Sequence, residues 1–154
     1  MSRVARILGA FLMLAVAGAA AAADAPPVVS DAWARATPPG VDVGAAYLTI
    51  DGGSRDDRLV AASTDRAKMV HLHTVEEQDG VAKMRATDAV AVPADRRVTL
   101  APKSTHLMLM GLAAPLVEGQ SFVVKLEFEV SGTQDVTVRV EPATGPGDGS
   151  QRHH

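Results

Sequence analysis

Four residues of this 154-residue chain could together bind a soft metal ion: His73, Met84, His106 and Met108. Thioether sulfur is soft and neutral and favours Cu(I), whereas imidazole nitrogen binds zinc, copper, nickel and iron alike. A set of two histidines and two methionines is therefore more selective for Cu(I) than either residue type alone. The chain contains no cysteine, so no thiolate competes for such a metal.

The spacing of these residues reads H-x10-M-x21-H-x-M, and here the chain resembles a known family, the periplasmic copper chaperones of the PCu(A)C type. The resemblance covers about residues 28 to 141, and both gaps match without insertion. It extends to the neighbours of the four residues, namely His73-Thr74, Asp79-Gly80, Lys83-Met84-Arg85, the run from His106 to Leu112, and the run from Pro115 to Gly119.

The resemblance implies a fold, a function and partners. The fold is all-β, a cupredoxin-like Greek-key β-sandwich in a single domain. The function is to bind Cu(I) through His73, Met84, His106 and Met108 and to deliver it for copper-enzyme assembly, typically the CuA centre of a cytochrome oxidase. An apo-oxidase subunit or a Sco-type assembly protein would then be the partner, and we expect a monomer.

The first 23 residues have the features of a secretory signal peptide. Arg3 and Arg6 precede an apolar stretch from Ile7 to about Ala17, and small residues follow up to Ala23. This stretch is shorter than the roughly 20 residues that a membrane span needs, and no later segment is long enough either. We therefore expect a periplasmic protein without a membrane span, with one domain over residues 24–143.

Composition argues against several classes of function. Without Arg3 and Arg6 the 15 basic residues become 13, against 18 acidic ones, which gives a formal net charge of −5. This charge and the absence of a basic stripe disfavour nucleic acid as a partner. The absence of cysteine excludes thiol–disulfide chemistry and blue-copper electron transfer. No nucleophile and base stand at a catalytic spacing, so we expect no enzyme activity.

Beyond the signal peptide, apolar and polar residues alternate with a period of two, which is typical of β-strands. The expected strands are residues 28–35, 44–51, 58–63, 68–75, 81–86, 97–100, 105–110, 121–130 and 135–140. Many short strands separated by Gly and Pro turns favour a sandwich or a barrel. Trp33 and Tyr47 are expected to fill the interior of the sandwich.

Two of the expected strand regions account for pairs of candidate ligands. Within the strand 105–110, His106 and Met108 share one face, because residues i and i+2 do so. For the other pair we expect a hairpin with a four-residue loop, residues 77–80, which places His73 directly opposite Met84. Directly paired residues have Cβ atoms about 4.5 to 5.5 Å apart, so both side chains could reach one ion. The x21 gap has no local explanation.

The remaining histidines and methionines have weaker claims. His71 shares a face with His73 and is either a spare ligand or a surface residue. Met69 and Met110 are interpreted as packing residues, although Met110 lies on the face of His106 and could shield the metal.

The last segment, residues 144–154, is rich in Gly, Pro and small polar residues and is predicted to be disordered. It ends in His153 and His154. This pair is either a weak auxiliary site for Cu(II) or a solvated end without a role.

Two other functions fit the same residues. A protein for copper tolerance or storage would use the same site without a specific acceptor, although one site per domain argues against bulk storage. A structural adhesion module would bind no metal at all. Copper titration separates the module from the other two, and transfer to an apo-oxidase domain separates a chaperone from a store.

Overall fold

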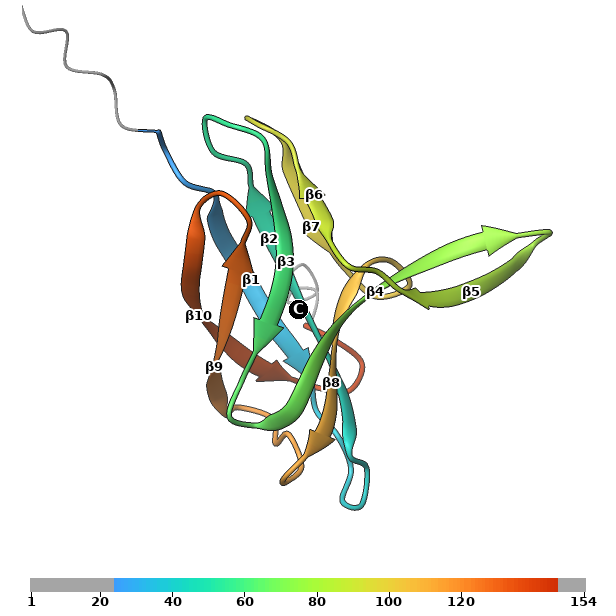
Figure 1. The fold of residues 1–154 in the computed structure, drawn as a ribbon. Coiled ribbons are helices and arrows are strands. Elements are labelled where there is room, and N and C mark those ends of the chain that lie inside the picture. Colours follow the sequence, from blue (N-terminus) through green and yellow to red (C-terminus); the bar gives the residue numbers. More distant parts are fainter. Residues whose placement is uncertain (1–23, 147–154) are drawn as a thin grey trace, which may run out of the picture.

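The computed structural model describes residues 24–146, which form ten β-strands and no helix (Figure 1). The strands are β1 Val28–Arg35, β2 Val43–Asp51, β3 Asp57–Ser63, β4 Ala67–Gln78, β5 Val81–Ala86, β6 Val90–Val92, β7 Arg97–Leu100, β8 His106–Leu112, β9 Ser121–Phe128 and β10 Gly132–Glu141. Every predicted strand is present, which confirms the all-β prediction. The sequence does not predict β6. Within the described residues, no helix is long and apolar enough to cross a membrane.

Seven strands close into one barrel-like circuit. The order is β4-β8-β2-β1-β10-β9-β3, and β3 returns to β4 through the pair Ala62 and Val70. Three strands lie outside this circuit: β5 pairs with β4, β6 with β3, and β7 with β2. The predicted cupredoxin-like Greek-key sandwich is not confirmed, because a sandwich has two separate sheets and this sheet closes on itself.

The hydrophobic core lies inside the circuit and is formed by alternate residues of the strands. In β9 every second residue from Phe122 to Phe128 is buried, as the alternation predicts. The same alternation buries Leu107 and Leu109 of β8 and Leu72 of β4. The residues between these core positions on β4 and β8 therefore point to the outer face of the circuit.

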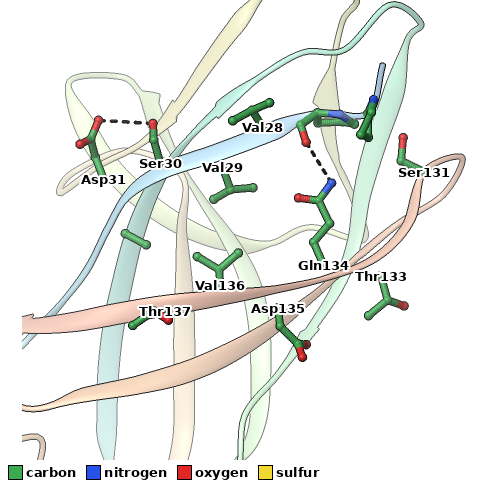
Figure 2. Close-up of a pocket in the computed structure, with 13 residues that line it drawn as sticks. Val28, Val29, Ser30, Asp31, Ser131, Thr133, Gln134, Asp135, Val136 and Thr137 are labelled. Atoms are coloured by element: carbon green, nitrogen blue, oxygen red, sulfur yellow. Dashed lines mark hydrogen bonds between the residues drawn. The ribbon is translucent and has the colours of Figure 1, made fainter. Parts of the chain in front are cut away.

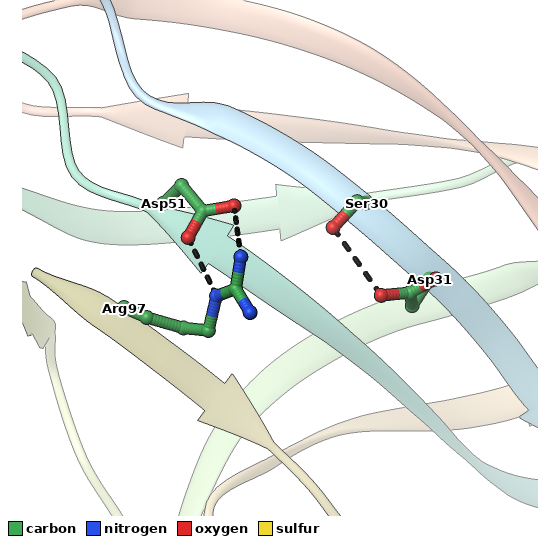
Figure 3. Close-up of polar contacts among 4 residues, drawn as sticks. All are labelled: Ser30, Asp31, Asp51 and Arg97. Carbon is green, nitrogen blue, oxygen red and sulfur yellow. Dashed lines mark hydrogen bonds and ion pairs between the residues drawn. The ribbon is translucent and has the colours of Figure 1, made fainter.

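A bulge in β1 changes which of its residues face outward. Ser30 pairs with Thr49, whereas Trp33 pairs with Tyr47, so β1 has one extra residue between the two pairs. Asp31 lies at this point with a φ of 50°, and its carboxylate accepts a hydrogen bond from the Ser30 hydroxyl (Figure 3). The bulge places Trp33 beside Tyr47 on the outer face. Sequence analysis instead expects both rings in the interior.

A second polar contact joins β7 to β2. Arg97 donates two hydrogen bonds to the carboxylate of Asp51, at 2.7 and 3.2 Å (Figure 3). These bonds hold the pKa of Asp51 below its usual value. Both side chains are well exposed to solvent, so the pair contributes little to folding stability.

The turn between β9 and β10 is shorter than the alternation pattern suggests. Phe128 pairs with Gly132, which has a φ of 76°, so Val130 lies in a three-residue turn rather than in a strand. Asp57 of β3 holds this turn, because its buried carboxylate accepts hydrogen bonds from the backbone N–H groups of Val130 and Ser131, each at 2.9 Å.

Candidate metal centre

Pairing of β4 with β8 brings the two candidate histidines together. His73 lies directly opposite His106 in the antiparallel register, and the ring centroids are 5.9 Å apart. Directly paired side chains lie on the same face of a sheet. The chain between these two strands includes β5 and the x21 gap that no local pattern explains, so this juxtaposition is a product of the tertiary fold.

His106 is the more firmly held of the two rings. Its side chain is 5% exposed, and its Nδ1 lies 2.9 Å from the backbone carbonyl oxygen of Ser104. A carbonyl oxygen can only accept, so Nδ1 carries the proton and Nε2 is left with its lone pair. A hydrogen bond from the distal ring nitrogen to a carbonyl is the usual way in which proteins orient a metal-binding imidazole.

His73 has an unsatisfied ring nitrogen. Its Nδ1 is buried and has no hydrogen-bond partner among the described residues. Burial lowers the pKa of His73 below its usual 6.5, and the neighbouring imidazoles of His106 and His71 lower it further. The ring therefore favours the neutral form, which is the form that binds metals. A bound cation would also satisfy the orphaned nitrogen, whose burial otherwise costs free energy.

Met108 and Met84 flank the paired histidines. Met108 lies two residues beyond His106, on the same face, and it is half-buried opposite His71. Met84 is on β5 and is 54% exposed. The hairpin of β4 and β5 extends away from the barrel as an arm (Figure 1), and β5, which carries Met84, is an edge strand of the sheet.

The expected register of this hairpin is wrong by two residues. Gln78, not Glu76, pairs with Val81, so the turn contains two residues instead of four. As a result His73 pairs with Ala86, and Met84 pairs with Val75.

The turn residues explain the difference. Asp79 and Gly80 have φ values of 54° and 75°, as a two-residue type I′ turn requires. Asp-Gly is the sequence signal for this turn, and the four-residue interpretation overlooks it. A shift of two residues keeps the face unchanged, so Met84 still lies on the face of His73, two residue pairs nearer the tip of the hairpin.

Aromatic side chains continue the row of histidines along the outer face. The Tyr47 ring lies 6.3 Å from the His106 ring, and the Trp33 ring lies 4.5 Å from the Tyr47 ring. Tyr47 is 6% exposed and His106 is 5% exposed, so this part of the row is covered from solvent. The sequence predicts Trp33 and Tyr47 in the interior, so neither ring is expected near the candidate ligands.

The described C-terminal segment reaches the same face. Gly145 is buried, and a Cβ at this position would lie 3.4 Å from the Trp33 ring. Residues 144–146, which the sequence assigns to the tail, are thus described next to the domain. His153 and His154 lie outside the described residues.

All methionines and histidines of residues 24–146 lie on one outer face, which we call the His/Met face. It is formed by β5, β4 and β8, and its members are Met69, His71, His73, Met84, His106, Met108 and Met110. None of the four methionines belongs to the hydrophobic core. The described residues contain no group of three or more His, Cys, Asp or Glu side chains placed to hold a metal. A four-ligand metal site on this face would therefore include thioethers.

A separate groove lies away from the His/Met face. It has a volume of about 620 Å³ and lies where β1 and β10 diverge (Figure 2). Its lining includes Ser30, Asp31, Thr133, Gln134 and Asp135, and it contains neither histidine nor methionine. This groove lacks soft ligands for Cu(I), so it does not compete with the His/Met face as a candidate copper site.

Comparisons with known proteins agree with the family resemblance. The family described as "Putative lipoprotein LpqE-like" matches residues 28–140. "Putative lipoprotein Lxx21020" from Leifsonia xyli subsp. xyli is 35% identical over 119 residues, which is 76% of this chain and 70% of that protein.

Solved structures of PCuAC domains share the fold. The copper-bound PCuAC domain from PmoF2 matches with a TM-score of 0.66 and 24% identity, covering 79% of this chain and 97% of that domain. Cu(I)-bound DR1885 from Deinococcus radiodurans matches with a TM-score of 0.59 and 31% identity, covering 81% of this chain and 83% of that protein.

Proposed function

Because the chain belongs to the LpqE-like family, which is of the PCuAC type, we propose that it is a copper chaperone that acts outside the cytoplasm. In this proposal His73, Met84, His106 and Met108 bind one Cu(I) ion. The observation that carries it is the gathering of every described methionine and histidine on the His/Met face. Methionines that only filled the core would be inside the circuit, where none is found.

The chemistry of the four ligands suits transport rather than catalysis. Imidazole and thioether are neutral ligands, so Cu(I) enters and leaves as a single positive charge and no electron needs to move. No proton is displaced from His73 either, because its lowered pKa favours the neutral ring. The role of the family as copper-binding proteins supports the same interpretation.

The exposure of the ligands suggests an order for copper release. Met84 lies on the edge strand and is 54% exposed, so a soft ligand of an acceptor can replace it first. Met108 is half-buried, and His106 is buried and oriented by Ser104. His106 would therefore be the last ligand to dissociate from the copper ion. Stepwise substitution of this kind never exposes a free copper ion to solvent.

The acceptor and the location complete the proposal. We propose delivery to the CuA centre of a cytochrome oxidase, directly or through a Sco-type assembly protein. Export would use residues 1–23 as a signal peptide, and His153 and His154 would bind Cu(II) weakly. Both segments lie outside the described residues.

A transfer experiment tests this function. The protein is loaded with one equivalent of Cu(I) without oxygen and mixed with an apo-CuA oxidase domain, and the copper content of each protein is measured after separation. We expect the copper to move to the oxidase domain faster than it reaches a chelator of matched affinity. Equal rates to both would contradict a chaperone and favour copper tolerance or storage.

A further inference from the structure

Three residues of the His/Met face have no part in the proposed four-ligand site: Met69, His71 and Met110. Met69 lies directly opposite Met110 in the pairing of β4 with β8. His71 follows Met69 by two residues on β4, so all three side chains share the outer face. One imidazole and two thioethers therefore lie in neighbouring positions on the same face of the sheet.

Packing does not explain these three side chains. Met69 is 56% exposed, His71 is exposed, and neither methionine belongs to the hydrophobic core. Met69 and His71 also line the same surface hollow of about 350 Å³, beside the single pair that joins β3 to β4. Met69 and His71 thus border open space that an ion could enter, and Met110 lies directly opposite Met69. Methionine has three rotatable bonds and can adjust to an ion there.

We propose that Met69, His71 and Met110 form a second Cu(I) site. The proposal rests on the proposed function, because the first site is its neighbour on the same face. Two neutral sulfurs and one imidazole nitrogen give a soft set that favours Cu(I) over zinc or Cu(II). The second site binds Cu(I) at least about tenfold more weakly than the first, because it has three ligands rather than four and no buried imidazole.

The position of the second site suggests its use. The His71 ring lies 6.1 Å from the His73 ring, and His71 pairs directly with Met108 of the first site. A Cu(I) ion can therefore pass from one site to the other by exchanging one ligand at a time. No bond other than a metal–ligand bond is broken, and copper remains Cu(I) throughout.

A titration followed by NMR tests the second site. The protein carries His153→Ala and His154→Ala, which removes the terminal histidines, and its methionines are labelled with ¹³C in the methyl group. Cu(I) is added from a competing chelator without oxygen. The first equivalent is expected to shift the methyl signals of Met84 and Met108, and the second those of Met69 and Met110. A titration that ends at one equivalent would overturn the proposal and leave the exposed methionines as an apolar docking surface.

Variants separate this proposal from the proposed function. Met69→Leu with Met110→Leu keeps the apolar volume and is expected to bind one Cu(I) instead of two, with the first affinity unchanged. If this variant still binds two, the second site is wrong. His73→Ala with His106→Ala is expected to lose the tight equivalent and keep the weak one. If that variant keeps the tight equivalent, the four-ligand site is wrong, whatever happens at the second site.

Discussion

At the scale of single residues, the proposed ligands differ in how firmly the fold holds them. His106 is buried, and a hydrogen bond to the carbonyl of Ser104 fixes its ring. His73 has a buried nitrogen without a partner, and Met84 is mostly exposed on an edge strand. This gradient from a buried, oriented imidazole to an exposed thioether fits the proposed function, in which copper is both bound and released.

Replacing the methionines of the first site tests their role as ligands. Met84→Leu or Met108→Leu keeps the apolar volume and is expected to change the free energy of unfolding by less than about 1.5 kcal/mol. Cu(I) affinity is expected to fall by at least about tenfold, because a soft ligand is lost, while weak Cu(II) binding by the imidazoles persists. Met69→Leu is the control and leaves the affinity of the first equivalent unchanged. Wild-type Cu(I) affinity in both variants would show that Met84 and Met108 are not ligands.

The lowered pKa of His73 predicts a pH dependence for the apo protein. Between the lowered folded pKa and the unfolded value of about 6.5, the unfolded chain binds more protons. Folding stability is therefore expected to fall as the pH drops from 6.5 to the folded pKa, and this contribution levels off below it. Denaturant unfolding of wild type and of His73→Gln at several pH values isolates the effect. A pKa of His73 at or above 6.5, measured by NMR titration of the folded protein, would contradict this prediction.

At the scale of elements, the hairpin of β4 and β5 determines whether Met84 can reach the histidines. The predicted bounds of β1, β5 and β7 agree with the structure, and turn residues precede both β5 and β7. The alternation predicts the face on which Met84 lies. It does not predict which residue of β4 pairs with Met84, because that depends on the length of the loop. The Asp79-Gly80 dipeptide carries the information on the turn.

Insertions in β5 test this register. One threonine inserted between Ala82 and Lys83 moves Met84 opposite Thr74, to the other face of the hairpin. Cu(I) affinity is expected to fall as in Met84→Leu. Two inserted threonines move Met84 directly opposite His73 and are expected to restore tight binding. Equal affinities for the two insertion variants would contradict the register argument.

The carboxylate of Asp57 connects β3 to the turn between β9 and β10. We expect the contribution of this contact to folding stability to depend on pH. Burial raises the pKa of Asp57, but the hydrogen bonds from Ser131, Val130 and Arg58 outweigh burial and lower the pKa below 3.8. The carboxylate therefore stabilises the fold above the unfolded pKa of about 3.9, and this contribution is lost as the pH falls through the lower folded value.

Asp57→Asn is expected to destabilise the fold by about 1 kcal/mol at pH 7, because a partly buried backbone N–H group loses its charged acceptor. Chemical denaturation measures the cost. Asp56→Asn is the control, because this exposed carboxylate accepts one backbone hydrogen bond, from Ala94. A cost no greater than that of the control would show that Asp57 does not hold the turn.

At the scale of the whole molecule, long-range strand pairing brings candidate ligands together, and no local pattern in the sequence predicts that pairing. The pairing of His73 with His106 joins two strands that are distant in the chain. The bulge at Asp31 reverses the direction of Trp33 by adding one residue, which alternation alone cannot show. β6 is only three residues long, too short for a period to be recognised. The candidate ligands themselves were predicted from residue chemistry and family spacing.

X-ray absorption spectroscopy of the protein loaded with one equivalent of Cu(I) tests the central claim most directly, because it counts the atoms bound to copper. The four-ligand site predicts two imidazole nitrogens and two sulfurs around Cu(I). Met84→Leu, which lacks the exposed thioether, is expected to lose one sulfur and to keep both nitrogens. A wild-type spectrum with nitrogen and oxygen ligands but no sulfur would contradict the site formed by His73, Met84, His106 and Met108.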